Sequence, residues 1–287
     1  MNERQSAKQI LRKPDWLKVR PPYSDECRRI KSMLSHLQLH TVCQEAACPN
    51  MAECFALGTA TFLIMGNVCT RDCLYCNVEH GYPAAVDENE IRHLADAVKK
   101  MKLEYVVITS VTRDDLPDGG ASVFADCIVR LREENPSCKV EVLIPDFKGN
   151  LDALQKVLKA KPDVINHNME VVRPIFTKLR PQGNYDVSLK LLKNISSSSI
   201  ISKSGFMIGF GESREDIRQL IDDLAAASCA RLTIGQYQQP TLKHWPVAKY
   251  YHPDEFAEFK QIAYQKGFQY VESGPLVRSS YHAAKAR

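Results

Sequence analysis

The sequence predicts an α/β fold: a partial TIM-like barrel of about six β/α units with parallel strands, flanked by a Cys-rich N-terminal extension and a C-terminal tail. Two observations lead to this prediction. From residue 61 onward, short apolar runs typical of strands alternate with longer segments whose apolar residues recur at i, i+3, i+4 and i+7. Such alternation indicates a parallel sheet whose strands are joined by right-handed helical crossovers.

The predicted strands are six short runs in which Val, Ile, Leu and Phe are frequent. In chain order they are Thr61–Met65, Tyr105–Thr109, Lys139–Ile144, Val164–His167, Ile200–Met207 and Arg231–Ile234. Helices are predicted between them where apolar residues fall on one face. The clearest of these faces are Ile91, Leu94, Ala95 and Val98; Phe124, Cys127, Ile128 and Leu131; and Ile217, Leu220, Ile221 and Leu224.

The chain divides into three parts. Residues 1–60 are rich in cysteine and show little regular periodicity, which predicts an extension wrapped on something larger. Residues 61–250 hold the barrel. Residues 251–287 are predicted to hold one more helix, with Phe256, Phe259 and Ala263 on its apolar face, and then a polar tail.

Composition narrows the class of protein. Of 287 residues, 44% are hydrophobic and 25% are charged, which is ordinary for a soluble globular protein. A net charge of +4 without dense Lys/Arg clusters does not favour nucleic acid, and it suits an acidic protein partner equally well. No apolar run approaches the roughly 18 residues of a membrane span. Ten cysteines without a secretory signal favour a reducing compartment, so we expect a cytoplasmic, metal-binding protein without membrane or nucleic-acid partners.

Six of the ten cysteines form two trios within 34 residues. The first trio, Cys43, Cys48 and Cys54, has the spacing C-x4-C-x5-C, and the second trio, Cys69, Cys73 and Cys76, has the spacing C-x3-C-x2-C. Disulfides use pairs, and a closed zinc site needs four ligands. A cubane iron–sulfur cluster has four irons, each usually bound by one thiolate. Each trio therefore leaves one iron open to a ligand from elsewhere in the chain or to a small molecule.

The second trio directly follows the first predicted strand. Loops at the carboxyl ends of parallel barrel strands build active sites. The spacing, with Tyr75 before the last cysteine, resembles the radical S-adenosylmethionine (SAM) enzymes. In that family SAM chelates the open iron through its methionine amine and carboxylate, and an electron from the cluster releases a 5′-deoxyadenosyl radical. A zinc site made by the second trio with His80 is the alternative.

A longer pattern narrows the resemblance. The first trio in HTVCQEAACPNMAECF, the second trio, and the tail Arg278-Ser279-Ser280-Tyr281 together resemble the lipoyl synthase family. The segments KPDWLKV, TSVTRDDLPDGGA, NHNMEVV, LRPQGNYDVSLKLL, KSGFMIGFGE and TIGQYQQP resemble that family in the same order, so the likeness covers nearly the whole chain. It implies that Ser280 ligates the open iron of an auxiliary cluster held by the first trio.

The resemblance also implies the reaction, the cofactors and the partners. The enzyme would be a sulfurtransferase that uses two [4Fe-4S] clusters and SAM. It would insert sulfur at carbons 6 and 8 of an octanoyl-lysine, with the auxiliary cluster as the sulfur donor. The octanoylated carrier would be the glycine-cleavage H protein or a lipoyl domain of a 2-oxoacid dehydrogenase. A low-potential donor such as ferredoxin or flavodoxin would supply electrons.

Several polar residues near predicted strand ends are candidates for binding SAM, and each has a structural alternative. Asp118, Gly119 and Gly120 follow the second strand, where related enzymes present backbone to the SAM methionyl group, but the same residues also suit an ordinary turn. Asn168 and Glu170 follow the fourth strand. We expect them to hydrogen-bond the SAM ribose or amine, or else to satisfy buried backbone groups.

Further candidates follow the same logic. Arg173 and Arg180 are expected either to hold the SAM carboxylate or to form surface ion pairs. Gln236 and Tyr237 follow the sixth strand, and we expect them to flank the adenine or the acyl chain. Gly209 and Gly211 favour close approach of adenosine or a tight turn.

Two alternatives to this function remain open. One is a different radical SAM enzyme, sulfur-inserting or dehydrogenating, with an auxiliary cluster. The other is an iron–sulfur or zinc protein that serves electron transfer or scaffolding. The cysteines outside the trios are predicted to be small buried hydrophobes: Cys27, Cys127, Cys138 and Cys229.

Overall fold

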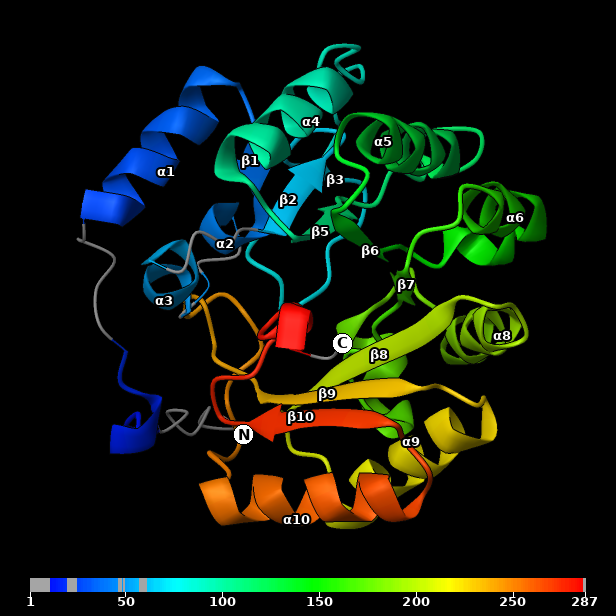
Figure 1. Ribbon diagram of the computed structural model, residues 1–287. Coiled ribbons are helices and arrows are strands. Elements are labelled where there is room, and N and C mark those ends of the chain that lie inside the picture. The colour runs from blue at the N-terminus through cyan, green and yellow to red at the C-terminus, as the bar shows by residue number, and fades with distance from the viewer. Residues whose placement is uncertain (1–10, 20–24, 46–47, 49, 57–60, 286–287) are drawn as a thin grey trace, which may run out of the picture.

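The computed structural model of the protein describes residues 11–19, 25–45, 48, 50–56 and 61–285. Its main sheet contains, from one edge to the other, β1 (His40–Thr41), β2 (Thr61–Ile64), β5 (Tyr105–Ser110), β6 (Lys139–Leu143), β7 (Val164–Asn166), β8 (Ile201–Ile208), β9 (Arg231–Gln236) and β10 (Tyr270–Gly274). Every neighbouring pair is parallel except β1 with β2. The sheet curls into the predicted partial barrel (Figure 1).

Helices cover the outside of this barrel (Figure 1). They are α4 (Glu90–Met101), α5 (Ala121–Glu134), α6 (Leu151–Lys159), α7 (Phe176–Leu179), α8 (Tyr185–Ser196), α9 (Arg214–Ala226) and α10 (Pro253–Gln265). The predicted apolar faces are the ones that pack on the sheet, since Leu94, Phe124 and Leu224 are each 0% exposed. Capping boxes fix the starts of α9 and α10, at Ser213 and His252.

The prediction of six β/α units is confirmed, but the sheet does not end near residue 250. Each of β2, β5, β6, β7, β8 and β9 is followed by a helix on the outer surface. The helix that follows β9 is α10, and β10 then pairs with β9 from Tyr270 to Gly274. Within β10 only Val271 is buried, so its sequence lacks the apolar run by which the other strands were recognised.

The N-terminal extension contains a regular helix that the sequence analysis missed. The structure has α1 (Asp25–His36), followed by the short helices α2 (Val42–Glu45) and α3 (Met51–Ala56). Ile30, Leu34 and Leu37 are buried at the i, i+4 and i+7 spacing of one helix face. Many of the other residues of α1 are charged, so the apolar stripe along the helix is narrow. As expected, the described part of the extension packs against the barrel.

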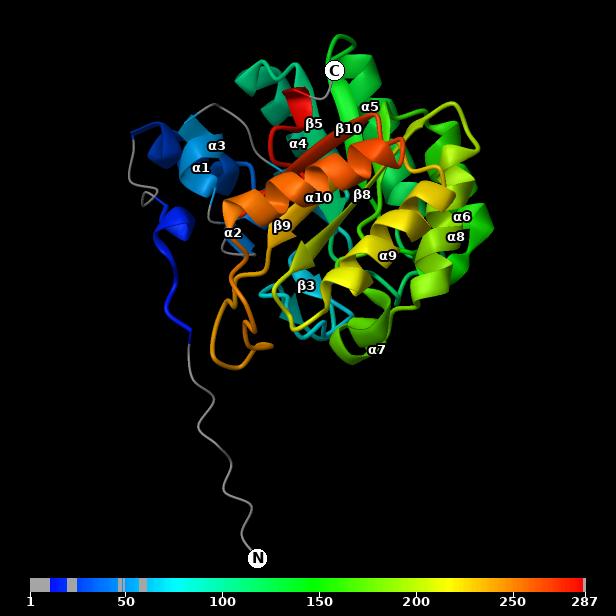
Figure 2. The ribbon, with the colours of Figure 1, turned by 90° about the horizontal axis from the view of Figure 1, so that it is seen from below.

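The two ends of the barrel carry different parts of the chain (Figure 2). The strands β3 (Val68–Cys69) and β4 (Glu79–His80), with the loop between them, lie at the carboxyl end of the barrel strands. The short 3-10 helix η4 (Ala283–Lys285) lies at the opposite end. The sheet leaves a seam between its two edge strands, β1 and β10, and α2 and α3 lie on that side (Figure 1). The barrel is therefore closed by segments from both ends of the chain.

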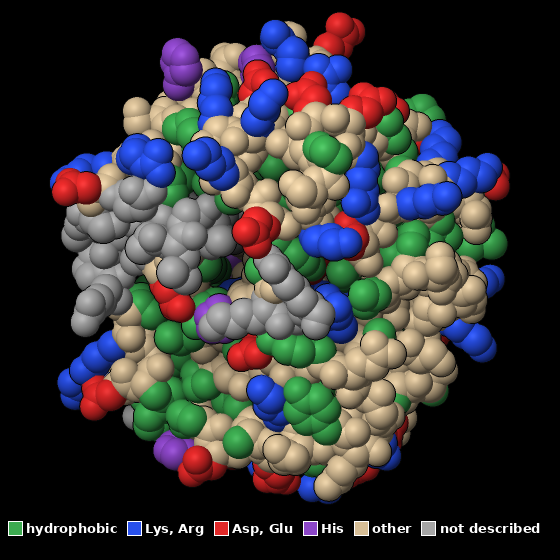
Figure 3. Space-filling model, in the orientation of Figure 1, with side chains coloured by type: hydrophobic (Ala, Val, Ile, Leu, Met, Phe, Trp, Pro, Cys, Tyr) green, Lys and Arg blue, Asp and Glu red, His purple; other side chains and the backbone are tan. Residues whose placement is uncertain are grey.

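Buried charges line the amino end of the barrel. Lys203 on β8 pairs with Glu141 on β6 at 2.7 Å, and both side chains are less than 5% exposed. The Tyr105 hydroxyl donates to the other Glu141 oxygen at 2.5 Å. On the outer surface, Figure 3 shows basic and acidic side chains interspersed over the face that Figure 1 presents. Within the described residues, no helix has the length and apolar character needed to cross a membrane.

Candidate functional site: two cysteine trios on a shared chamber

The second trio lies in the loop at the carboxyl end of β2, as predicted. Contacts with other strands and helices fix this loop. Thr70 donates to the carbonyl oxygen of Thr112 through both its backbone N–H, at 3.0 Å, and its hydroxyl, at 2.9 Å. The backbone N–H of Leu74 donates to the carbonyl oxygen of Leu179 at 2.9 Å. The loop is therefore held at the ends of β5 and α7.

All three cysteines of the second trio line one cavity, which we call the radical cavity. Backbone N–H groups of Thr112 and Arg71 point to the sulfur of Cys69, at 3.3 and 3.4 Å. Burial raises the pKa of Cys73, and it raises the pKa of Cys76 to about 12. A metal must therefore displace the thiol protons when it binds, because only thiolate is a ligand.

Arg71, inside this loop, is an anchoring residue that the sequence analysis did not single out. Its guanidinium binds Asp146 through two hydrogen bonds, at 2.7 and 2.8 Å, and Asp114 through two more, at 2.8 and 3.0 Å. Arg71 is only 5% exposed. Burial raises the pKa of Asp146, but the Arg71 hydrogen bonds outweigh it and bring that pKa down to about 2. This bidentate pairing ties the cysteine loop to the loops after β5 and β6.

Asn168, Glu170 and Arg180 meet in the radical cavity, beside the second trio. Asn168 donates to Glu170 at 3.0 Å, and Arg180 donates to the backbone carbonyl of Met169 at 3.2 Å. The side-chain oxygen of Asn168 and the Nε atom of Arg180 are buried without a partner among the described residues. Burial raises the pKa of Glu170, while Arg180 opposes that shift. Buried polar atoms that lack partners are typical of a site that binds a polar ligand.

Tyr75 lines the same cavity, as its position before Cys76 predicted. Its ring packs edge-on against Phe210, with centroids 6.1 Å apart. Phe210 in turn stacks on Tyr237 with centroids 4.1 Å apart. Tyr237 is fixed by a hydrogen bond of 2.6 Å to the carbonyl oxygen of Trp245. This aromatic group forms one wall between the cysteine loop and β9.

Asp118, Gly119 and Gly120 lie outside the radical cavity, and their predicted contact with SAM stays a prediction. The Asp118 carboxylate accepts hydrogen bonds from the backbone N–H groups of Gly120 and Ser122, at the start of α5. It also accepts one from Lys156 on α6. Asp118 and Gly119 line a separate surface depression with Phe147 and Lys148. Gly120 has φ of +88°, and a β-carbon there would overlap the sulfur of Met65. These residues form the alternative, an ordinary turn.

Gln236 does not face the cavities either. Its side-chain nitrogen donates to the carbonyl oxygens of Ile208, Tyr237 and Lys249, at 3.0, 3.1 and 3.0 Å. Its side-chain oxygen accepts from the Tyr251 N–H at 2.9 Å. The side chain of Gln236 is thus fully hydrogen-bonded to backbone groups, and its predicted contact with SAM stays a prediction. A β-carbon on Gly209, whose φ is +117°, would overlap this amide, so this glycine serves a close internal contact.

Arg173 and His167 make structural contacts. Arg173 pairs with Asp186 at 2.9 Å and stacks over Tyr185 near the surface, so it forms the surface ion pair that was its alternative. His167 is buried and hydrogen-bonds the carbonyl oxygen of Ile144 and the hydroxyl of Ser188, both at 2.9 Å. Outside the trios, three cysteines are buried as predicted: Cys127, Cys138 and Cys229. The side chain of Cys27 lies outside the described residues.

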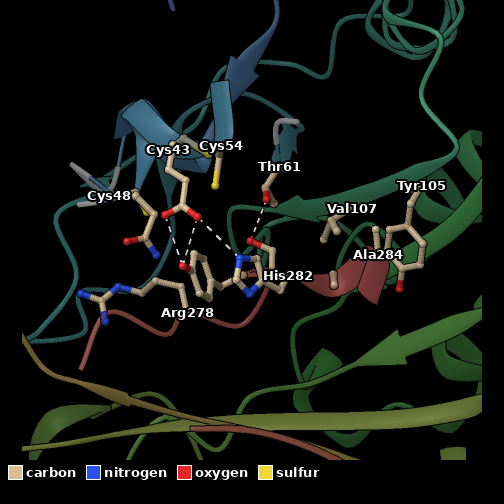
Figure 4. A pocket seen from close by; sticks show the side chains of 14 residues that line it. Cys43, Cys48, Cys54, Thr61, Tyr105, Val107, Arg278, His282 and Ala284 are labelled. Carbon is tan, nitrogen blue, oxygen red and sulfur yellow. Dashed lines mark hydrogen bonds and ion pairs between the residues drawn. The ribbon is translucent and has the colours of Figure 1, made fainter. Parts of the chain in front are cut away.

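The first trio lies across the seam of the barrel and lines a second cavity, which we call the auxiliary cavity. Cys43 comes from α2, Cys54 from α3 and Cys48 from between them. Figure 4 shows these three side chains on one side of the cavity, with Arg278 and His282 of the tail opposite. Burial and the nearby Cys48 raise the pKa of Cys43 to about 12, although a hydrogen bond from the Thr61 backbone opposes them.

The tail is held against this cavity by contacts with three elements. The hydroxyl of Thr61, the first residue of β2, donates to the hydroxyl of Ser280 at 2.8 Å. Tyr281 donates to Glu53 on α3 at 3.2 Å. Arg278 donates to the carbonyl oxygen of Gln236 at 2.8 Å. Ser280 thereby lines the auxiliary cavity together with all three cysteines of the first trio.

A third, middle cavity connects the other two through shared lining residues. It shares Cys43, Cys48 and Ser280 with the auxiliary cavity. It shares Tyr75, Cys76, Asn168 and Glu170 with the radical cavity. Residues from both trios therefore face one chamber inside the barrel.

The donor sets fit iron–sulfur clusters better than single ions. No three His, Cys, Asp or Glu side chains in the described part of the chain converge closely enough to bind one metal ion. In a cubane each cysteine binds a different iron, so three thiolates around a wide cavity suit a cluster. His80, needed for the zinc alternative, is exposed on β4. The partnerless atoms of Asn168 and Arg180 fit a polar ligand such as SAM.

Comparisons with known proteins agree with this geometry. A family model described as the radical SAM superfamily matches residues 63–224, more than half of the chain. Among solved structures, methylornithine synthase superposes with a TM-score of 0.56 at 11% identity, over 74% of this chain and 70% of that chain, which shows a shared fold. The partial barrel and the cysteine loop at its mouth thus define a radical SAM enzyme.

The more specific matches come from the whole sequence. A model described as the N-terminal domain of lipoyl synthase of the radical SAM family matches residues 1–48. Lipoyl synthase of Hahella chejuensis is 51% identical over 96% of this chain and 84% of the relative. Lipoyl synthase of Caldanaerobacter subterraneus subsp. tengcongensis is 51% identical over 95% of this chain and 96% of the relative. The chain belongs to the lipoyl synthase family.

Proposed function

We propose that this protein inserts two sulfur atoms, at carbons 6 and 8 of an octanoyl chain bound to a lysine of a carrier protein. Membership of the lipoyl synthase family supports the reaction. One structural observation carries the assignment of roles within it: the middle cavity is lined by Cys43 and Cys48 from the first trio and by Cys76 from the second. A substrate in that cavity has access to both cluster sites.

Different residues around the radical cavity would contact different parts of SAM and of the cluster that binds it. The second trio would ligate three irons of a [4Fe-4S] cluster, and Tyr75 would pack beside the bound cofactor. Arg180 Nε is a buried donor suited to a carboxylate, and the Asn168 oxygen is a buried acceptor suited to a ribose hydroxyl. Glu170 would accept from the methionine amine. Bound here, SAM supplies the radical that removes hydrogen from an unactivated carbon.

The first trio and Ser280 would hold a second [4Fe-4S] cluster. Cys43, Cys48, Cys54 and Ser280 all line the auxiliary cavity and would give the cluster four ligands. A serine oxygen is a harder ligand than a thiolate and is unusual on such a cluster. This cluster would supply the inserted sulfur, and the iron bound by Ser280 would be the one released most readily.

The middle cavity supplies the shape that an octanoyl chain needs. Val42, Leu143, Met207 and Val277 give it apolar walls. Gly205 and Gly235 on β8 and β9 line it as well, so its floor lacks side chains there. Apolar walls keep water away from a reactive radical, and a narrow chamber holds the reacting carbons at near-contact distance.

The carrier and the electron donor are proposed from the family alone. An octanoylated glycine-cleavage H protein or the lipoyl domain of a 2-oxoacid dehydrogenase would present the substrate. A low-potential ferredoxin or flavodoxin would reduce the cluster held by the second trio. Because the chain must be delivered on a protein, free octanoic acid is expected to be a very poor substrate.

The proposal is tested by anaerobic turnover of the reconstituted protein with SAM, a chemical reductant and an octanoylated carrier domain. Mass spectrometry of the carrier should show the loss of two hydrogens and the gain of two sulfurs. Iron analysis should give about eight irons per chain, as two cubanes require. Formation of 5′-deoxyadenosine with an unmodified carrier would indicate a radical SAM enzyme that acts on another substrate. Bound zinc without sulfide would overturn the proposal.

A further inference from the structure

Thr61 touches both halves of the auxiliary site. It is the first residue of β2 and is 5% exposed. Its hydroxyl donates to the Ser280 hydroxyl at 2.8 Å. Its backbone N–H hydrogen-bonds the sulfur of Cys43. One residue thus contacts a cysteine of the N-terminal extension and the serine of the C-terminal tail.

The two partners of Thr61 differ in how firmly the fold holds them. Thr61 lies in a strand that pairs with β5, where its register partner is Val107. Ser280 lies between β10, which ends at Gly274, and η4, which begins at Ala283. The backbone carbonyl of Ser280 accepts a hydrogen bond of 3.3 Å from the N–H of Ala283, at the start of η4, so the Ser280 backbone is held only at the edge of that short helix. The direction of its hydroxyl oxygen depends on side-chain contacts.

The contact also distinguishes the two adjacent serines. Ser280 lines both the auxiliary and the middle cavity, while Ser279 lines the middle cavity. The hydrogen bond from Thr61 joins the Ser280 hydroxyl to the residue whose backbone also contacts the sulfur of Cys43. Because Thr61 is the donor in this bond, the Ser280 oxygen is the acceptor, and a metal-bound serine oxygen can also accept it.

We propose that Thr61 is the positioning residue that aims the Ser280 oxygen at the open iron of the auxiliary cluster. The inference rests on the proposed function, in which Ser280 ligates that iron. Groups that hydrogen-bond a metal ligand fix its orientation, and their loss typically weakens metal binding by about 10- to 100-fold. Thr61 therefore acts through Ser280 and sets how firmly the fourth iron is retained before turnover.

The test compares Thr61→Val with Thr61→Ser. Valine keeps the branched side chain that suits a strand and removes the hydroxyl, whereas serine keeps the hydroxyl. Both variants, Ser280→Ala, and the double variant Thr61→Val/Ser280→Ala are reconstituted anaerobically. Loss of iron to a chelator is followed over time, and electron paramagnetic resonance after mild oxidation detects three-iron clusters. Formation of 5′-deoxyadenosine, which depends on the second trio, reports whether the barrel is folded.

Thr61→Val should lose one iron per chain about 10-fold faster than the wild type and should show a three-iron signal. Thr61→Ser should retain iron as the wild type does. The double variant should lose iron no faster than Ser280→Ala alone, because Thr61 acts through Ser280. Wild-type iron retention in Thr61→Val, or additive losses in the double variant, would overturn the inference. Failure of the wild type to thiolate the carrier would instead count against the proposed function.

Discussion

The carbonyl oxygen of Val277 occupies the place where a β-carbon on Gly235 would lie. Gly235 is on β9, facing the middle cavity, and Val277 belongs to the tail that carries Ser280. The absence of a side chain at this strand position lets the tail lie directly on the sheet. Backbone cannot move aside as a flexible side chain can, so any larger residue at position 235 must displace the tail.

We therefore expect Gly235→Ala to separate the two activities. The tail should shift outward, Ser280 should lose its place at the first trio, and thiolation of the carrier should fall at least 10-fold. Cleavage of SAM to 5′-deoxyadenosine should persist, because the loop of the second trio is held at the ends of β5 and α7. Gly274→Ala is the matched control: it is the register partner of Gly235, and its β-carbon would lie at an ordinary 3.4 Å from the Val277 side chain. Equal thiolation by both variants would contradict this reasoning.

The two trios should have separable roles. Cys73→Ala should abolish SAM cleavage, because the cluster that holds and reduces SAM would lack a ligand. Cys54→Ala should leave cleavage measurable while it stops sulfur insertion. Chromatography of 5′-deoxyadenosine and mass spectrometry of the carrier measure the two outcomes in one reaction. Lipoyl product from Cys54→Ala would show that the sulfur comes from elsewhere.

The neighbouring serines give a sharper comparison. Ser280→Ala should spare SAM cleavage and impair sulfur insertion, whereas Ser279→Ala should be milder. Ser280→Cys should form a more inert auxiliary cluster, because a thiolate holds iron in such clusters more firmly than an oxygen ligand does. Iron release per turnover and the absorption spectrum of the cluster are the measurements. An unchanged spectrum with normal product in Ser280→Ala would remove Ser280 from the ligand set.

The buried pair of Arg71 and Asp146 should make stability depend on pH. The pKa of Asp146 falls from 3.8 to about 2 on folding, so the pair contributes about 2 kcal/mol above pH 4. That contribution is lost as the pH falls through about 2, where the folded-state carboxylate becomes protonated. Asp146→Asn should thus be less stable than the wild type at pH 7, and the difference should narrow by about half near pH 3. Urea unfolding at the two pH values measures it, and a constant difference would contradict the assignment.

The parts of the site that could be predicted from sequence are those encoded locally. The second trio follows a strand within a few residues, so its place at the carboxyl end of the barrel followed from the strand itself. The same holds for Asn168 and Glu170 after β7. Arg71 was missed because its partner Asp146 is 75 residues away, and no spacing rule connects the two.

Gln236 shows how a small error in a strand boundary changes a functional prediction. The sequence suggested a strand ending at Ile234, which left Gln236 in an active-site loop. The strand instead runs to Gln236. Side chains alternate along a strand, so Gln236 shares the face of Leu232 and Ile234, which pack under the helices. Asp118 lies outside the radical cavity for a related reason: it is eight residues past Ser110, beyond the stretch that the end of β5 positions.

The contact between Thr61 and Ser280 has a consequence for biosynthesis. The two residues are 219 positions apart, so the ribosome makes every strand of the barrel before it makes Ser280. A nascent chain that folds from its N-terminus can therefore complete the pocket of the second trio while the pocket of the first still lacks its serine. The order of synthesis leaves the first trio accessible to incoming iron and sulfide during that interval, and the arrival of the tail then encloses it.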